Sequence, residues 1–320
     1  MKYSIITPTY NREDCIGRCI ESVIRNISPS LDFEHIVVDD GSTDGTSGII
    51  ERYAQENMHI KFIKFEHNKG TNAARNAAIS SAAGDFCIIL DSDDYFAADA
   101  LSIIDTTVNE FPQFSHYLFA PNDRAYYFNQ NKLLHGKKTQ ILTFQDFLSG
   151  KITGDFIHVV KTSTLKKYPF DETLKIFEGV FFLKFYKEAG QILFTNQIVT
   201  IRERNRTDSV SKDFIRTSVD IIKRTIKSGD LWMKWFEGDC VKLGVYNLLI
   251  EKYTNLLENH LLVSDYISAN NDIAKINKYK GDITPTLKLV YALRCGAIYR
   301  LMLQVYLKLK YNVFRVKLRS

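Results

Sequence analysis

Apolar runs and helical patterns alternate along the first hundred residues, and this alternation limits the possible folds more than any other feature of the chain. Short buried-strand patterns occupy residues 3–7, 35–38, 60–65 and 86–90. Helical patterns lie between them: one with Ile16, Ile20, Val23 and Ile27 on one face, one through Tyr53, and an alanine-rich one over 71–83. Strands that alternate with helices predict an α/β fold, a mostly parallel sheet wound by right-handed crossovers with helices on both faces.

Polar segments follow these predicted strands at the point where each strand ends. They are Thr7-Pro8-Thr9, Asp39-Asp40-Gly41-Ser42, Asn68-Lys69-Gly70 and Asp91-Ser92-Asp93-Asp94. Ligands of open α/β sheets bind beyond the carboxyl ends of the strands. We therefore expect these four loops to form one site.

The acidic segment Asp91-Ser92-Asp93-Asp94 contains an Asp-x-Asp pattern. Carboxylates at positions i and i+2 after a buried strand can converge on one hard divalent cation, and Mn²⁺ and Mg²⁺ bind a few carboxylates together with phosphate oxygens. Such an ion would bridge a diphosphate and offset the charge that develops on a leaving phosphate. The alternative for the triplet alone is an acidic cap of the following helix.

Two further residues at this edge suit a nucleotide ligand. Asp39 could accept a hydrogen bond from a base or ribose, although a helix-capping turn explains it equally well. Arg75, at the start of the alanine-rich helix, is a natural partner for a phosphate or a carboxylate. The glycines at 41, 45 and 48 match neither a dinucleotide fingerprint nor a phosphate loop.

The remainder of the chain is predicted to be α+β to about residue 213 and purely helical afterwards. We expect a helix over 98–108, a strand over 117–120, a hairpin around Tyr126-Tyr127-Phe128, and two strands at 192–194 and 198–201. Breaks between the later helices are predicted near Gly229-Asp230, Val263-Ser264 and 282–285. The predicted domains are therefore 1–213 and 214–320.

The net charge of +5 is unevenly distributed, because residues 214–320 carry 18 basic against 9 acidic side chains. On a helical wheel over 286–317, one side holds Arg294, Arg300, Gln304, Lys308 and Arg315, and aliphatic residues fill much of the remainder. Basic and apolar helices of this kind often lie in an anionic membrane interface; the alternative is a helix packed on the N-terminal domain. Nucleic acid is disfavoured, because the basic residues accompany aliphatic side chains rather than stacking aromatic ones.

Five cysteines without paired spacing indicate a reducing compartment and no metal-binding cysteine motif. The chain begins directly with a strand pattern rather than a signal peptide, and its C-terminal apolar stretches are shorter than a membrane span. We expect a cytoplasmic protein that is peripheral on the inner face of the cell membrane.

Four ordered motifs resemble those of the family-2 glycosyltransferases, whose fold is called GT-A. They are Thr7-Pro8-Thr9-Tyr10-Asn11-Arg12, the 38–44 segment around Asp39, Asn68-Lys69-Gly70 with Ala73-Ala74-Arg75-Asn76, and Leu90-Asp91-Ser92-Asp93-Asp94. The match is strong over 1–96, thinner to about 213, and absent beyond it.

This resemblance implies a role for each matching residue. Thr7, Pro8, Tyr10 and Arg12 would line the nucleotide pocket, and Asp39 would contact the uracil or ribose. Asp91, with Ser92 beside it, would face the ribose and sugar, whereas Asp93 would be the main metal ligand. The loop with Arg202, Arg204 and Arg206 would close over the diphosphate; a solvated basic loop is the alternative.

The family inverts the anomeric centre, so a carboxylate base must stand near the acceptor hydroxyl. It usually comes from a Glu-Asp pair after a Phe-Asp-Glu segment. This chain has Phe170-Asp171-Glu172 and then Glu178-Gly179. Glu178 is the candidate base, and Gly179 departs from the family pattern.

The resemblance implies transfer of a hexose or N-acetylhexosamine from a UDP-sugar to a glycan hydroxyl. The acceptor would be linked to a polyprenyl diphosphate, in the assembly of a bacterial surface polysaccharide such as an O-antigen. A nucleotidyltransferase is disfavoured, because the segment after the first strand lacks its Gly-rich loop. The alternative from another class, suggested by Gly179, is a non-catalytic sugar- or membrane-binding protein on a degenerate transferase fold.

Overall fold

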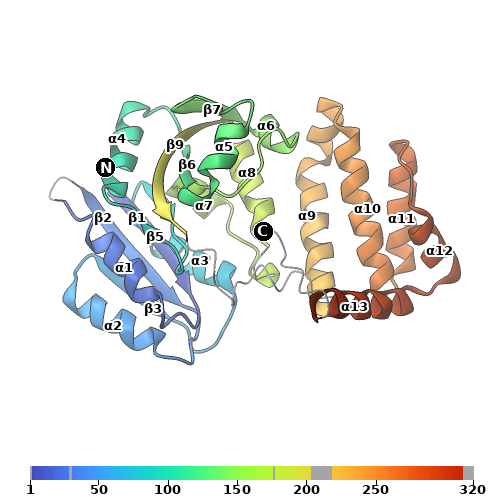
Figure 1. Ribbon diagram of the computed structural model, residues 1–320, viewed down its shortest axis with the longest axis horizontal. Helices are drawn as coiled ribbons and strands as arrows, with labels where there is room; N and C mark the ends of the chain where they lie inside the picture. Colours follow the sequence, from blue (N-terminus) through green and yellow to red (C-terminus); the bar gives the residue numbers. More distant parts are fainter. Residues whose placement is uncertain (1, 29–30, 176, 203–217, 313–320) are drawn as a thin grey trace. The chain divides into compact units, whose positions relative to one another are not determined.

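The computed structural model describes residues 2–28, 31–175, 177–202 and 218–312, and the chain divides into two compact units (Figure 1). The units are Met1–Asn205 and Arg206–Ser320. The predicted boundary at residue 213 lies outside the described residues.

One mixed sheet forms the centre of the N-terminal unit. Its strands run in the order β3-β2-β1-β4-β8-β6-β9-β5, and β7 also pairs with β9. Their bounds are β1 (Lys2–Thr9), β2 (Asp32–Asp39), β3 (Ile60–Lys64), β4 (Phe86–Ile89), β5 (Tyr95–Phe96), β6 (His116–Pro121), β7 (Thr139–Thr143), β8 (Ile157–Lys161) and β9 (Gln191–Ile201). The first four strands are mutually parallel, whereas β8 runs antiparallel between β4 and β6. The predicted α/β fold is confirmed.

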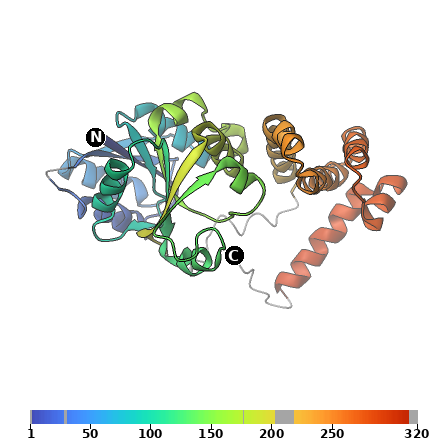
Figure 2. The same ribbon diagram turned by 90° about the horizontal axis from the view of Figure 1, so that it is seen from above.

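Helices α1 (Ile16–Ile24), α2 (Thr46–Glu56) and α3 (Thr71–Ser81) connect the first four strands (Figures 1 and 2). The apolar face of α1 joins a core with strand residues such as Ile5 and Val37, and α4 (Ala100–Glu110) contributes to the same core. Helix α3 packs instead against β1 and β2 through small buried residues. Ile27 was predicted on the α1 face, but it lies beyond the helix end and is 41% exposed.

Two predictions for the second half of the unit are wrong. The aromatic segment at 126–128 belongs to helix α5 (Ala125–Gln130) rather than to a hairpin. The reason is tertiary packing: Phe128 is fully buried, with ring centroids 5.0 Å from Phe156 and 5.1 Å from Phe194, while Tyr126 faces solvent.

The second wrong prediction concerns 192–201, where β9 is one strand rather than two. The polar interruption at Asn196 and Gln197 does not end the strand. The backbone N–H of Asn196 donates to the carbonyl of Lys138, and pairing with β6 resumes after a register shift. Four short helices complete the unit: α5, α6 (Phe144–Leu148), α7 (Thr162–Lys167) and α8 (Gly179–Ala189), with 3-10 turns at Asn122–Arg124 and Glu172–Leu174.

The C-terminal unit is helical over its described residues, as predicted. It contains α9 (Val219–Leu243), α10 (Tyr246–Leu262), α11 (Tyr266–Lys278), α12 (Pro285–Leu293) and α13 (Gly296–Asn312). The breaks near 264 and 282–285 are confirmed, the latter with Thr284 capping α12. None of the described helices is long and apolar enough to cross a membrane.

The remaining two helix boundaries differ from prediction. Helix α9 runs through Gly229, because this glycine allows α10 to approach: a Cβ there would lie 2.7 Å from Leu256 Cδ2. The chain breaks instead at Gly244, which has a φ of +67°. The single helix predicted over 286–317 is interrupted at Arg294, in the left-handed conformation, and α13 begins only at Gly296.

Candidate active site

The loops predicted to converge meet beyond the carboxyl ends of β1, β2 and β4. The backbone N–H of Asn11 donates to Ser42 Oγ at 2.8 Å, and that of Thr43 donates to Asn11 Oδ1 at 2.9 Å. The Asp40 carboxylate accepts the N–H groups of Lys69 and Gly70 at 2.7 and 2.8 Å. Burial raises the pKa of Asp40, and these two donors oppose the shift. Three loops are thus tied together in front of α3.

Arg75 joins the remaining loop to a distant helix. This buried side chain, on α3, places Nη2 3.2 Å from Asp91 Oδ1 and Nη1 3.3 Å from Glu178 Oε2. Its guanidinium also lies over the Phe170 ring, 5.7 Å from the centroid. The Arg75 guanidinium therefore joins the acidic segment after β4 to the carboxylate of Glu178, which precedes α8.

Glu178 has the properties that a general base requires. Its side chain is 34% exposed, so the carboxylate is reachable. Burial raises its pKa, Arg75 lowers it, and Asp91 raises it further. A carboxylate with a raised pKa is a stronger proton acceptor. Gly179 beside it opens α8, and a Cβ at that position would meet nothing within 4 Å.

The acidic segment forms a tight turn in which the backbone N–H of Asp94 donates to the carbonyl of Asp91 at 3.0 Å. Asp91 is about half exposed, Asp93 is half-buried, and Ser92 and Asp94 are buried. Burial raises the pKa of Asp94 to about 8, and the charge of Asp91 adds to the shift while Arg202 opposes it.

Arg202, predicted to bind a diphosphate, contacts carboxylates in this structure. Its Nε lies 3.1 Å from Asp94 Oδ2, and its Nη1 lies 2.7 Å from Asp155 Oδ2. Neither Asp94 nor Asp155 was assigned a role from the sequence, because no local pattern links them to a residue so distant in the chain. Arg204 and Arg206 lie outside the described residues.

The residues predicted to bind the nucleotide divide into two groups. Tyr10, which is 41% exposed, and Arg12, which is half-buried, follow β1 in the segment that Asn11 ties to the loop after β2. The others are buried: Pro8 lies within β1, Thr7 Oγ1 is 2.9 Å from His35 Nε2, and the Asp39 carboxylate accepts the hydroxyls of Ser42 and Ser47. Asp39 thus holds the loop after β2 in place; its predicted contact with a nucleotide stays a prediction.

The acidic segment suits a divalent cation that binds together with a phosphate-containing ligand. Among the described residues no three His, Cys, Asp or Glu side chains form a ready-made metal cage. Mg²⁺ is commonly held by one or two carboxylates while phosphates and water supply the other ligands. Asp91 and Asp93 offer hard oxygen ligands of this type, and they stand two residues apart in the turn that follows β4.

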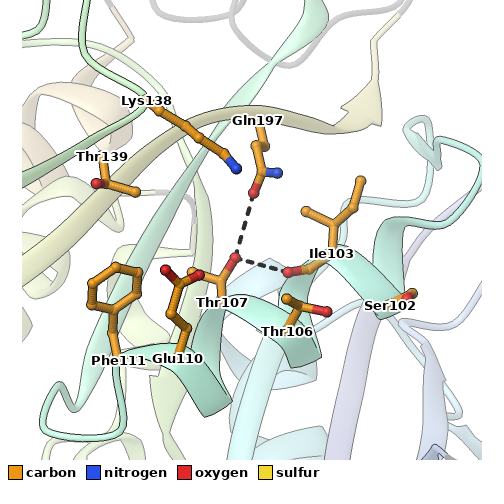
Figure 3. Close-up of a pocket in the computed structure, with 9 residues that line it drawn as sticks. All are labelled: Ser102, Ile103, Thr106, Thr107, Glu110, Phe111, Lys138, Thr139 and Gln197. Atoms are coloured by element: carbon orange, nitrogen blue, oxygen red, sulfur yellow. Dashed lines mark hydrogen bonds between the residues drawn. The ribbon is translucent and has the colours of Figure 1, made fainter.

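A cavity of about 190 Å³ lies elsewhere in the unit, between α4 and β9 (Figure 3). Figure 3 shows the Thr107 hydroxyl on the cavity wall, 2.8 Å from the Ile103 carbonyl and 3.5 Å from Gln197 Oε1. None of its lining residues belongs to the four loops. It is therefore separate from the site formed around Arg75.

Sequence comparisons place the chain in a family. Residues 4–145 match the model of glycosyl transferase family 2. The GalNAc(5)-diNAcBac-PP-undecaprenol beta-1,3-glucosyltransferase of Campylobacter jejuni is 30% identical over 216 residues, which are 66% of this chain and 67% of that protein. An uncharacterized glycosyltransferase of Haemophilus influenzae is 32% identical, over 61% of this chain and 76% of that protein. The chain belongs to the family-2 glycosyltransferases.

Solved structures agree on the fold. The crystal structure of Staphylococcus aureus TarS 1-349 in complex with UDP-GlcNAc has a TM-score of 0.62 at 21% identity, covering 87% of this chain and 89% of that one. In sequence, the poly(ribitol-phosphate) beta-N-acetylglucosaminyltransferase TarS of S. aureus strain Mu50 is 40% identical over 102 residues, only 18% of that protein. The structural likeness shows a GT-A type fold with a helical C-terminal region.

Proposed function

We propose that this glycosyltransferase is inverting and metal-dependent, and that it moves a hexose or N-acetylhexosamine from a UDP-sugar to a glycan hydroxyl. The observation that carries the proposal is the contact of Arg75 with both Asp91 and Glu178. This contact supports the proposal, because Glu178, the candidate base, and the acidic segment that would bind the diphosphate through a divalent cation share one guanidinium.

In the proposed reaction the acceptor oxygen attacks the anomeric carbon while the bond to the diphosphate breaks on the opposite side. Glu178 accepts the hydroxyl proton, and Arg75 orients its carboxylate. Asp93, with Asp91, would hold Mn²⁺ or Mg²⁺, which when bound offsets the charge on the departing diphosphate. Tyr10 and Arg12 border the space for the nucleotide.

The identities of donor and acceptor are proposed by analogy. TarS 1-349 was solved with UDP-GlcNAc, and the Pyrobaculum calidifontis mannosyltransferase PcManGT with GDP-Man and Mn²⁺. The C. jejuni relative is named for an undecaprenol-linked acceptor. For this chain we propose a UDP-sugar and a polyprenyl-diphosphate-linked acceptor, used at the cytoplasmic face of the membrane during assembly of a surface polysaccharide.

A second candidate function is a non-catalytic sugar-binding protein on the same fold. Gly179 favours it, because the family usually places a carboxylate at this position and the surrounding space would accommodate one. The presence of Glu178 at the first position of the pair, with a raised pKa, favours the catalytic function instead.

Turnover tests the proposal directly. The full chain is incubated with Mn²⁺, a polyprenyl-diphosphate-linked glycan and each common UDP-hexose and UDP-N-acetylhexosamine in turn, with GDP-mannose as the matched donor control. We expect UDP release, an acceptor heavier by one sugar, and an inverted anomeric configuration by NMR. Retention of configuration, or turnover with GDP-mannose alone, would overturn the assignment; binding without any turnover would support the non-catalytic candidate.

A further inference from the structure

Helix α13 carries an apolar face that no described part of its unit covers. Its exposed members are Ile298 (61%), Leu301 (60%), Met302 (65%), Val305 (50%) and Leu309 (52%). They stand at positions i, i+3, i+4, i+7 and i+11, which is the spacing of one continuous stripe along a helix. We call these five residues the α13 stripe.

The opposite face of α13 holds the helix in the bundle. The Tyr299 hydroxyl donates to Glu258 Oε1 at 2.9 Å, and the Gly296 N–H donates to the Tyr266 hydroxyl at 3.0 Å. Leu303 and Leu307, on the same side as Tyr299, are half-buried, and α13 contacts α10 and α12. Figure 2 shows α13 along an edge of the helical unit rather than among its helices. The α13 stripe is therefore a second apolar face that the bundle does not need.

The charge of the C-terminal segment distinguishes two possible partners of this face, a second copy of the chain and an anionic surface. The sequence contains eight basic residues and no acidic residue after Asp282. The neighbouring helix adds exposed Leu289 and Leu293, with Lys288 and Arg294 beside them in the sequence. A symmetric dimer through this face would combine two copies of a segment whose basic residues no acidic residue of the same segment offsets, which disfavours association. An anionic surface would instead attract them.

We propose that the α13 stripe lies in the headgroup region of an anionic phospholipid bilayer, with the helix parallel to the membrane plane. Apolar side chains then enter the acyl boundary while neighbouring basic residues remain near the headgroups. The proposal rests on the proposed use of a lipid-linked acceptor and specifies which residues meet the lipid. It differs from the sequence-based wheel, because Arg300 stands on the packed side with Tyr299 and is half-buried.

Vesicle flotation of the full chain tests this inference. The chain is mixed with vesicles of phosphatidylcholine alone or of phosphatidylcholine with phosphatidylglycerol. We expect flotation with the anionic vesicles, reduced by salt, and binding at least about tenfold weaker for the double variant Leu301→Asp, Val305→Asp. Ile267→Asp is the matched control: this residue of α11 is 82% exposed, apolar and outside the stripe, so its substitution should leave binding unchanged.

A fluorescence measurement tests the same contact without adding negative charge to the helix. The emission maximum of the indole added in Met302→Trp should shift to shorter wavelength with vesicles that contain phosphatidylglycerol. It should not shift with vesicles of phosphatidylcholine alone. Equal binding by wild type and the double variant, or no binding of wild type, would overturn the inference. So would a dimer, detected by light scattering without lipid, that the double variant disrupts.

The outcomes are distinguishable from failure of the proposed function. The double variant should retain UDP release with an acceptor analogue that lacks the polyprenyl chain, because Leu301 and Val305 are not among the residues assigned to the site around Arg75. Lipid binding without any UDP release would disprove the proposed transfer and leave the membrane surface standing.

Discussion

Arg75 is the residue on which the geometry of the site depends. Its guanidinium is buried, contacts Asp91 and Glu178, and stands over the Phe170 ring. Removing a carboxylate from water costs free energy, and a buried cation beside it offsets part of that cost. Asp91 and Glu178 both gain this compensation from Arg75. The raised pKa of Glu178 indicates that burial and Asp91 still outweigh Arg75. The ion pair thus orients the Glu178 carboxylate, and its raised pKa is consistent with the proposed role as the base.

Glu178→Gln keeps the size of the side chain and removes its basicity. We expect kcat/KM to fall roughly 100- to 10,000-fold with little change in UDP-sugar affinity. In wild type the activity should decline as pH falls through the raised pKa of Glu178, at a higher pH than for an ordinary glutamate. Glu188→Gln, at the far end of α8, should behave as wild type. Turnover by Glu178→Gln close to that of wild type would remove Glu178 from the mechanism.

Gly179→Asp restores the carboxylate that the family usually has. The substitution should fold normally, because no atom lies within 4 Å of the added Cβ and the backbone there needs no glycine. If Glu178 is the base, kcat should stay within a few-fold of wild type. A large increase in kcat would show instead that the chain has lost its base at 179, and would favour the degenerate-fold alternative. Steady-state kinetics with the UDP-sugar that gives the highest turnover distinguishes these two outcomes.

At the scale of elements, the helical unit contains a buried histidine–aspartate pair that joins α10 to α11. His260 Nδ1 on α10 lies 2.6 Å from Asp272 Oδ2 on α11, and both residues are 6% exposed. Burial lowers the pKa of His260, but the hydrogen bond and charge of Asp272, with the charges of Asp230 on α9 and of Asp265, outweigh it and raise the pKa overall. The hydrogen bond between His260 and Asp272 therefore ties α10 to α11, and the nearby charges of Asp230 and Asp265 favour the charged imidazole.

His260→Gln should destabilise the chain by about 3 kcal/mol, because Asp272 is then buried without its cation. The pKa of His260 is higher in the folded chain than in the unfolded one. Its contribution is therefore complete below about pH 6.5 and is lost as pH rises through the folded value. Urea unfolding followed from pH 6 to 9 should show this loss in wild type and a flatter profile in the variant. Parallel profiles would contradict the assignment.

At the scale of the whole molecule, the two units differ in both charge and architecture. The acidic residues of the site gather at one sheet edge of the N-terminal unit, whereas the excess of basic residues lies in the helical one. A ligand that binds only the folded chain stabilises it by mass action. Thermal unfolding therefore reports donor binding even where the acceptor is unknown.

The correct UDP-sugar with Mn²⁺ should raise the melting temperature, corresponding to about 2.7 kcal/mol when its concentration is a hundred times Kd. Without the ion the shift should shrink, because the diphosphate then meets uncompensated carboxylates. Asp93→Asn should lose the Mn²⁺-dependent part of the shift, while Asp99→Asn, an exposed acid before α4, should keep it. A shift in Asp93→Asn that still depends on Mn²⁺ would exclude Asp93 as the main metal ligand.

Local sequence determined the strands and helices of the first hundred residues, and it predicted that their loops form one site. These elements have strong periodicity, and parallel strands necessarily present their carboxyl ends at one edge. Residues 126–128, Gly229 and 192–201 were misassigned because tertiary contacts overrode local pattern: Phe128 found a buried aromatic pocket, and Gly229 admitted a neighbouring helix.

Which charged side chains meet is a property of the folded chain alone. The sequence identified Arg75, Asp91 and Glu178 separately, but their contact spans some hundred residues and depends on α3 and α8 lying against the same loops. The pairing of Arg202 with Asp94 and Asp155, and the exposure of one face of α13, likewise have no local signal. Periodicity arises from neighbouring residues and is readable along a chain, whereas burial and ion pairing depend on distance in space, which only the folded chain defines.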